Sequence, residues 1–373
     1  MRVLLTGANG FIGKNLAMQL WAQKDVDVLT FGHDQNVNEL TEMLERADWV
    51  IHLAGVNRPI DPNEFVAGNH QFTEQLCDAI RDTGRIVPVI FSSSIKAEQD
   101  NPYGKSKKAA EETLLQFQRE TANPVFIYRL PNVFGKWARP DYNSVVATFC
   151  HRILNNLAVD VHDPLASIRL VYVDDVVNSF ILLLNDTDMS GGFVEINPEY
   201  QVTVGGLLQH LREFKKTRDL LTIERVGSGL KRALYSTYVS YMETDCFAYS
   251  VPRHADARGV FVEMLKTTDS GQFSYFTANP GVKRGGHYHH SKTEKFLVIK
   301  GRAQFRFRHI LTNELHELFV SGEKSEIVET VPGWTHDIIN IGDDELICML
   351  WANEVFNREK PDTFFDSQDN DGQ

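Results

Sequence analysis

Short apolar runs alternate with amphipathic stretches through the first third of the chain. The apolar runs that we expect to form strands are residues 1–6, 26–31, 49–54, 86–91 and 125–128. After the first run, apolar positions recur at helical spacing as far as Trp21. Strands that alternate with helices are typical of an α/β fold, in which a doubly wound parallel sheet is covered by helices on both faces.

The pattern changes from about residue 226, where short strand-like segments replace the alternation of strands and helices. We expect strands at residues 260–265, 272–277, 294–299, 303–309, 317–320, 325–330 and 345–352. Short strands at close spacing, with turn residues between them, indicate an all-β sandwich or barrel. We therefore predict two domains, 1–243 and 244–373.

Composition narrows the classes of function without naming one. The 373 residues carry a net charge of −12, which argues against nucleic acid or an acidic membrane surface as the main partner. No apolar run approaches the ~20 residues that a membrane span needs, and the first residues form a strand rather than a signal peptide. The 4 cysteines are scattered and form no CxxC pair, which favours free thiols and a cytoplasmic location.

A glycine-rich turn lies between the first predicted strand and the first predicted helix. Glycines at this place allow a tight turn, a close approach of the backbone to a pyrophosphate, and close packing of helix on strand. The sequence therefore predicts a Rossmann-type nucleotide site. Its loop residues are Gly7, Asn9, Gly10, Phe11, Ile12 and Gly13.

Tyr103 and Lys107 are four residues apart, so they share one face of the helix that we expect there. A lysine ammonium beside a tyrosine hydroxyl lowers the pKa of the phenol. We therefore expect Tyr103 to act as an acid or base near neutral pH.

The glycine spacing and the Tyr103–Lys107 pair resemble the extended short-chain dehydrogenases/reductases. The resemblance implies that Ser94, the last of a serine run, hydrogen-bonds the substrate oxygen. It also implies that Leu53, Ala54 and Gly55 line the cofactor. Tyr103 and Lys107 would contact the cofactor as well as catalyse the reaction.

Two further segments resemble the substrate-binding part of that family. Asn132 lies in a stretch similar to its RxxNxxG segment, and Arg169 begins a stretch similar to a later signature. In that signature the arginine often meets a diphosphate, although a surface ion pair is an equal alternative for Arg169. Ile95 and Lys96 follow Ser94 where sugar-nucleotide dehydratases carry an Asp-Glu pair. The sequence therefore favours a reductase or a 4-epimerase.

The second predicted strand ends without a carboxylate that could hold a ribose 2′-hydroxyl. His33, with Lys14 possible as a neighbour, could tolerate a 2′-phosphate there instead, so we expect NADPH as the cofactor. A plain surface position for His33 is the alternative reading.

His287, His289 and Glu294 match the first motif of the metal-binding cupins, and His336 matches the second. Histidines at i and i+2 of a strand project from the same face. Three imidazoles and a carboxylate form a ligand set that suits zinc, manganese, iron(II) or nickel. A metal held in this way can polarise a carbonyl, which acidifies the neighbouring carbon and permits epimerisation.

Over its full length the chain resembles the bifunctional capsular-polysaccharide enzymes of the CapF type, on the residues quoted above and on the His-Tyr-His-His stretch at 287–290. The resemblance implies a UDP-2-acetamido-2,6-dideoxy-L-4-ketohexose substrate. The cupin domain would epimerise C3, and the reductase domain would then reduce C4 with NADPH. It also implies zinc in the barrel and a homo-oligomer, either a dimer or a tetramer.

Two questions stay open at the level of the sequence. The base that acts at C3 is not identified, and His290 and Lys292 are the candidates. An alternative function is an NADP-dependent ketosugar reductase whose barrel has only a structural role.

Overall fold

The computed structural model describes residues 1–32, 34–61, 63–186, 189–252, 254–256, 259–261, 265–267, 271–354 and 359–365. The chain divides into two compact units, and each contains two separate stretches of sequence. The first unit consists of residues 1–144 and 167–202, and the second of residues 145–166 and 203–373. The boundary at residue 243 stays a prediction about the sequence domains.

A six-stranded parallel sheet forms the centre of the first unit, with the strand order β2-β1-β3-β4-β5-β8. Its strands are β1 (Arg2–Thr6), β2 (Asp27–Phe31), β3 (Trp49–His52), β4 (Val89–Ser94), β5 (Val125–Leu130) and β8 (Gly192–Val194). A small sheet combines β6 (Asn132–Phe134), β7 (Ser167–Tyr172) and β9 (Tyr200–Thr203).

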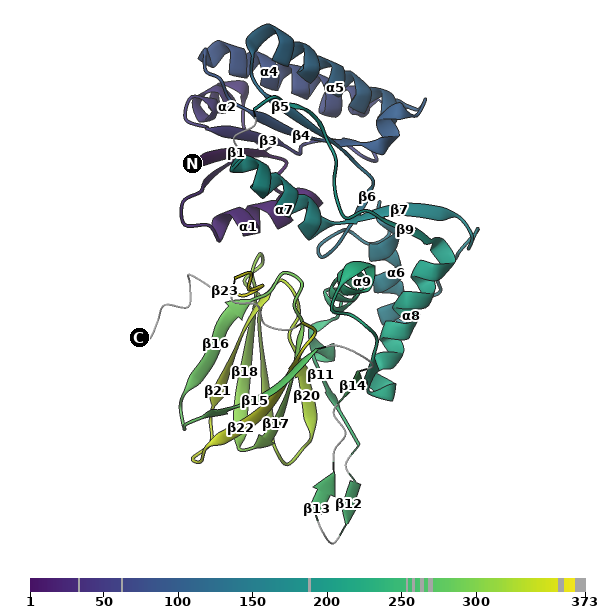
Figure 1. The fold of residues 1–373 in the computed structure, drawn as a ribbon, viewed down its shortest axis with the longest axis vertical. Helices are drawn as coiled ribbons and strands as arrows, with labels where there is room; N and C mark the ends of the chain where they lie inside the picture. The colour runs from purple at the N-terminus through teal and green to yellow at the C-terminus, as the bar shows by residue number, and fades with distance from the viewer. Residues whose placement is uncertain are drawn as a thin grey trace. The chain divides into compact units, whose positions relative to one another are not determined.

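Helices cover both faces of the six-stranded sheet (Figure 1). One face carries α2 (Val37–Leu44), α4 (Phe72–Thr83) and α5 (Pro102–Thr121), and the other carries α1 (Phe11–Trp21) and α7 (Val173–Leu184). Three short helical segments, α3 (Asn63–Phe65), η1 (Val66–Gln71) and η2 (Ile95–Glu98), complete this unit. The five predicted strands correspond to β1–β5, which confirms the α/β class.

Two five-stranded antiparallel sheets form most of the second unit (Figure 1). The first has the order β11-β20-β17-β22-β15 and the second β19-β18-β21-β16-β23. Their strands are β11 (Ala248–Ser250), β15 (Gln272–Ala278), β16 (Lys283–Tyr288), β17 (Glu294–Lys300), β18 (Arg302–His309), β19 (Leu315–Ser321), β20 (Glu326–Glu329), β21 (Trp334–Asn340), β22 (Leu346–Ala352) and β23 (Phe364–Phe365).

Side chains from both sheets meet in one apolar core, which includes Phe296, Phe305 and Cys348. The all-β fold predicted for this part of the chain is therefore confirmed. The other elements of the unit are α6 (Val145–Leu154), α8 (Val204–Leu220), β10 (Thr222–Ile223), α9 (Gly229–Val239), η3 (Thr244–Cys246), β12 (His254–Asp256), β13 (Gly259–Phe261) and β14 (Lys266–Thr267). Among the described residues, no helix has both the length and the apolar character that a bilayer span requires.

Candidate functional site

The glycine-rich turn follows β1 and leads directly into α1. Gly7 has φ +72°, and a Cβ atom there would lie 2.6 Å from the backbone nitrogen of Ala54. Gly10 donates its N–H to the carbonyl oxygen of Gly7 at 2.9 Å and is the N-cap of α1, where no side chain caps the helix. The first amides of α1 are therefore left for an anionic ligand such as a pyrophosphate.

A cavity of about 710 Å³ opens beside this turn in the first unit. The predicted site residues that line it are Gly7, Asn9, Gly10, Phe11, Ile12, Gly13, Leu53, Gly55, Ser94, Tyr103, Lys107 and Asn132. Ala54 does not line the cavity; its N–H is donated to Thr6 Oγ1 at 3.2 Å, behind the glycine turn. His33 lies outside the described residues.

Ser94, Tyr103 and Lys107 meet at one side of the cavity, where β4 ends and α5 begins. Burial raises the pKa of Tyr103, and a hydrogen bond with Ser94 offsets part of that rise. Burial lowers the pKa of Lys107 to about 8, although the Glu111 carboxylate acts in the opposite direction. The Lys107 ammonium donates to the carbonyl oxygen of Ser92 at 3.1 Å.

The expected lowering of the phenol pKa by Lys107 is not what the structure shows. The lysine charge is directed at the Ser92 carbonyl, and burial dominates the environment of Tyr103. Tyr103 therefore stays protonated at neutral pH. This state suits a group that donates a proton to a ketone oxygen during reduction.

Two buried polar side chains beside this cluster were not anticipated from the sequence. Asn69 bonds both backbone polar groups of Val56, with Oδ1 accepting at 2.8 Å and Nδ2 donating at 3.0 Å. Glu111, 1% exposed, accepts hydrogen bonds from Ser93 Oγ and from Arg129. Glu111 follows Lys107 by four residues on α5, and this spacing is a signal that sequence reasoning could have used.

Two arginines, Arg58 and Arg139, also line the cavity. The guanidinium carbons of Arg58 and Arg139 lie 5.9 and 5.3 Å from the ring centroid of Tyr142. Among the described residues, no carboxylate forms an ion pair with either arginine. Arg169, in contrast, does not line the cavity and forms an ion pair with Glu199, with Nη2 and Oε2 2.7 Å apart.

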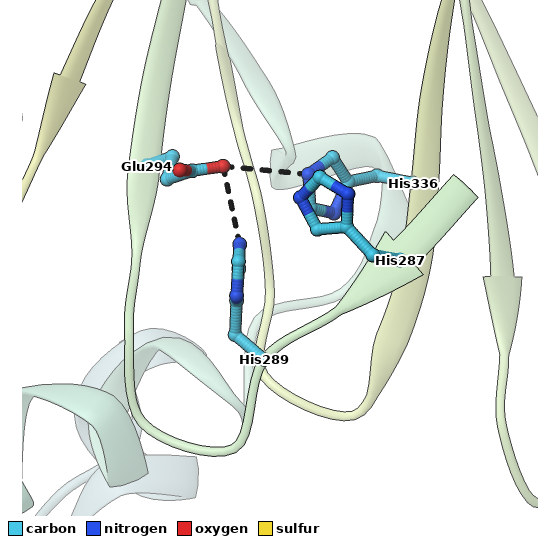
Figure 2. Close-up of side chains that lie close together, drawn as sticks. All are labelled: His287, His289, Glu294 and His336. Carbon is cyan, nitrogen blue, oxygen red and sulfur yellow. Dashed lines mark hydrogen bonds and ion pairs between the residues drawn. The ribbon is translucent and has the colours of Figure 1, made fainter. Parts of the chain in front are cut away.

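In the second unit, four predicted ligands converge from separate segments (Figure 2). His287 lies on β16, His289 just beyond its end, Glu294 at the start of β17, and His336 on β21. One candidate ligand atom from each lies within 4.8 Å of the others. Glu294 Oε2 is 3.2 Å from Nε2 of His289 and 3.3 Å from Nε2 of His336.

The protonation states of His287 and Glu294 suit metal ligation, whereas the pKa of His289 is raised, because the Glu294 carboxylate outweighs the effect of burial there. Burial lowers the pKa of His287 to about 3, and the neighbouring histidines add to the shift, so its imidazole is neutral. Burial alone would raise the pKa of Glu294, but the charges and hydrogen bonds of His289 and His336 hold it well below its usual range. A neutral imidazole and an ionised carboxylate are the forms that bind metals. The three histidines and one glutamate fit a single divalent ion.

The two candidates for the base at C3, His290 and Lys292, both lie in the loop between His289 and Glu294, but their side chains have different surroundings. The Lys292 ammonium lies 2.6 Å from Glu294 Oε1, at the ligand cluster. The His290 ring packs instead against Phe364, with ring centroids 4.7 Å apart. His289 lies beyond the end of β16, so it does not share a strand face with His287 as the spacing suggested.

The parallel sheet, its glycine turn and the Ser-Tyr-Lys cluster define a nicotinamide-dependent enzyme class. Residues 3–197 match the NAD dependent epimerase/dehydratase family, and residues 254–364 match the polysaccharide biosynthesis C-terminal domain. The chain belongs to the NAD dependent epimerase/dehydratase family. The expectations of an enzyme and of a nicotinamide cofactor are thereby confirmed.

Full-length relatives narrow this class further. A Pseudomonas aeruginosa protein named UDP-2-acetamido-2,6-beta-L-arabino-hexul-4-ose reductase is 56% identical, with 98% of each chain covered. The crystal structure of the capsular polysaccharide assembling protein CapF from Staphylococcus aureus matches 98% of this chain and 99% of its own, with 39% identity and a TM-score of 0.67. These matches confirm the resemblance to the CapF type.

A more distant structure agrees in fold alone. The UDP-glucuronic acid 4-epimerase from Bacillus cereus, in complex with NAD, is 20% identical and has a TM-score of 0.53. The match covers 58% of this chain and 83% of that one.

Proposed function

We propose that the chain is a bifunctional sugar-nucleotide enzyme with two consecutive activities. The cupin barrel epimerises C3 of a UDP-2-acetamido-2,6-dideoxy-L-4-ketohexose. The first unit then reduces C4 with NADPH to UDP-2-acetamido-2,6-dideoxy-β-L-talose, a precursor of UDP-N-acetyl-L-fucosamine for capsule or O-antigen. One observation carries this proposal: the Ser94–Tyr103–Lys107 cluster and the four-residue ligand cluster occur in a single chain.

In the reductase, a nicotinamide cofactor supplies the hydride when it is bound. Tyr103 donates its phenolic proton to the C4 oxygen, so that hydride and proton together convert the ketone to a hydroxyl. Ser94 orients the ketone by a hydrogen bond. Lys107 holds the nicotinamide ribose. The raised pKa of Tyr103 supports its role as the donor.

The charge of the cavity supports anionic ligands. Of the described residues that line it, five are lysines or arginines and one is a carboxylate, Glu64. We assign the diphosphate of the sugar nucleotide to Arg58 and Arg139 rather than to Arg169. Both line the cavity beside Tyr142, whereas Arg169 is paired with Glu199. NADPH is proposed over NADH because β2 ends without a carboxylate in Leu29–Gly32, and Lys14 lines the cavity.

In the epimerase, His287, His289, Glu294 and His336 would hold a divalent ion, which we propose is zinc. A bound ion supplies Lewis acidity, which makes the hydrogen at C3 of a 4-ketosugar more acidic. Of the two candidates for the base, Lys292 lies at the ligand cluster through its contact with Glu294. The predictions of a homo-oligomer and of a cytoplasmic location stand beside this proposal.

Proton exchange at C3 tests the bifunctional function directly. The enzyme is incubated with the UDP-4-ketosugar in D2O without NADPH, and C3 is followed by NMR. We expect deuterium at C3 in the unaltered enzyme and none in His336→Ala, which still oxidises NADPH with an authentic 3-epimer substrate. Absence of exchange in the unaltered enzyme, with NADPH consumption intact, would support the alternative of a reductase with a structural barrel.

A further inference from the structure

Asp362 comes from the C-terminal segment and binds the loop that separates two of the metal ligands. Its carboxylate accepts three consecutive backbone N–H groups, from His290 at 2.9 Å, Ser291 at 2.7 Å and Lys292 at 2.6 Å. It also accepts the hydroxyl of Ser291 at 2.9 Å. Consecutive amides around one anion form a concave binding site, and here the anion is supplied by the chain itself.

The main chain of Asp362 acts on a ligand directly. Its carbonyl oxygen is hydrogen-bonded to Nδ1 of His289. A carbonyl can only accept, so Nδ1 carries the hydrogen and Nε2 is the nitrogen that faces Glu294. An acceptor that binds the ring N–H opposite the metal-binding nitrogen fixes both the tautomer and the orientation of the imidazole.

The rest of the loop is held by other contacts. The N–H of Thr293 is donated to Asn353 Oδ1 at 3.0 Å, and the N–H of Asn353 to the Thr293 carbonyl at 3.1 Å. Each backbone N–H of residues 290–293 is therefore bonded to a side chain, which is either Asp362 or Asn353. Of these, Asp362 bonds three, so we expect it to be the main determinant of the path from His289 to Glu294.

The segment that carries Asp362 is docked on the ligand strand. β23 pairs with β16 antiparallel, with Phe365 opposite His287 and Phe364 opposite Tyr288. The rings of Phe364 and Tyr288 are stacked, with centroids 5.6 Å apart. The segment therefore reaches both parts of the centre: its strand lies beside His287, and Asp362 holds the loop that begins at His289.

We propose that Asp362 is the positioning residue of the metal centre, and that the segment 359–365 is a structural part of that centre. Because Asp362 holds the loop in the form that presents His289 and Glu294 together, metal binding and docking of the segment stabilise each other. This coupling is reciprocal by thermodynamic necessity. The inference rests on the proposed metal site but not on its catalytic role.

Zinc affinity provides the first test, measured by chelator competition on the full chain. We expect Asp362→Ala to bind zinc about 10–100-fold more weakly than the unaltered chain, the usual effect of losing a group that positions metal ligands by hydrogen bonds. Asp362→Asn, which keeps one carbonyl oxygen as acceptor, should fall between the two. The matched control is Asp343→Asn, an exposed aspartate before β22, which should bind zinc normally. Unchanged affinity in Asp362→Ala would overturn the proposal.

Reductase turnover and thermal unfolding of the same variants establish that the chain still folds. Hydrogen exchange of the peptide that contains residues 359–365 gives a second readout that does not depend on activity. We expect zinc to slow exchange in this peptide for the unaltered chain but not for His336→Ala. If zinc does not change the hydrogen-exchange rate of this peptide in the unaltered chain, the coupling is refuted.

The outcomes separate this proposal from the proposed function. If Asp362→Ala loses zinc but still exchanges deuterium at C3, the metal is not catalytic, and the positioning role stands. If the unaltered chain binds no zinc, the positioning role fails, whereas deuterium exchange at C3 still decides the proposed function separately.

Discussion

The pH dependence of the reductase offers a sharp test, because the charge of Lys107 depends on one buried neighbour. Burial lowers the pKa of Lys107 to about 8, and the Glu111 carboxylate limits that fall. Replacing Glu111 with glutamine keeps the shape of the side chain and removes its charge. Arg129 keeps a second carboxylate partner in Glu98, at 2.7 Å.

The size of the effect follows from the charge that is removed. An opposite charge within reach shifts a pKa by about 1–3 units. With the smallest of these shifts, the pKa of Lys107 in Glu111→Gln falls from about 8 to about 7. Lysine is cationic below its pKa, so activity that needs the cation is present at low pH and is lost as pH rises through that value. At pH near 8 the charged fraction then drops from about one half to about one tenth, which predicts about a fivefold loss.

The assay is kcat/KM for ketosugar reduction, followed by NADPH absorbance across the pH range. The matched control is Glu112→Gln, the exposed neighbour on the same helix, which should leave the profile unchanged. We expect the alkaline limb of the Glu111→Gln profile to begin at lower pH, with little change in kcat/KM at acidic pH. If the alkaline limb of the pH profile keeps its position or shifts to higher pH, while thermal unfolding is unaffected, the assigned role of Glu111 is refuted.

Three further predictions concern stability and binding. Glu329, 4% exposed, pairs with the buried Lys295, so Glu329→Ala should lower the free energy of unfolding of the second unit by about 3–5 kcal/mol in a urea titration. A Cβ at residue 13 would lie 2.8 Å from the Cα of Ala8, so Gly13→Ala should destabilise the glycine turn by about 1–3 kcal/mol and weaken NADPH binding in a fluorescence titration. Arg139→Ala should raise the KM for the UDP-ketosugar about 10–100-fold through the loss of a charged hydrogen bond, and leave the Kd for NADPH unchanged. A weaker Kd for NADPH with normal KM would instead place Arg139 at the cofactor.

Local patterns in the sequence were sufficient for five of the six strands of the parallel sheet and for the four residues of the ligand cluster. Most of the residues predicted for the nucleotide and substrate site line the cavity, but Ala54 and Arg169 do not. The strands β1–β5 are apolar runs, and β1, β3, β4 and β5 are each followed by residues that line the cavity. The cupin spacing selected four side chains that lie together in the structure. Such features are visible because each depends on a short stretch of chain.

Four strands of the two barrel sheets were missing from the expected set, namely β11, β16, β21 and β23. Two of them, β16 and β21, carry metal ligands. β16 (Lys283–Tyr288) contains two lysine or arginine residues and two glycines, and β21 (Trp334–Asn340) contains a histidine, an aspartate and an asparagine. Neither shows a clear alternation of apolar and polar positions, because the inward-facing positions are used for polar chemistry. Functional strands of this kind lack the usual period-2 signal.

Long-range contacts explain the rest of what was missed. Asp362 lies 70 to 72 positions along the chain from the amides whose hydrogen bonds it accepts. Nothing in the adjacent sequence indicates that it binds the ligand loop. The pKa of Tyr103 was misjudged for a similar reason. Spacing along α5 brings Lys107 to the same helix face, but it does not reveal that the Ser92 carbonyl binds the ammonium.

The division of the chain into interleaved units limits how the two activities can be separated. The chain passes between the units three times, after residues 144, 166 and 202, so no single cut yields both units intact. A fragment that ends near residue 243 would keep α9 but remove Ser291, the partner of Arg232 and Ser236. Gene dissection would therefore damage the barrel side of the enzyme, and an evolutionary split into two free-standing proteins would first require a rearrangement of these crossings. Point substitutions that silence one centre at a time are the practical route to each half-reaction.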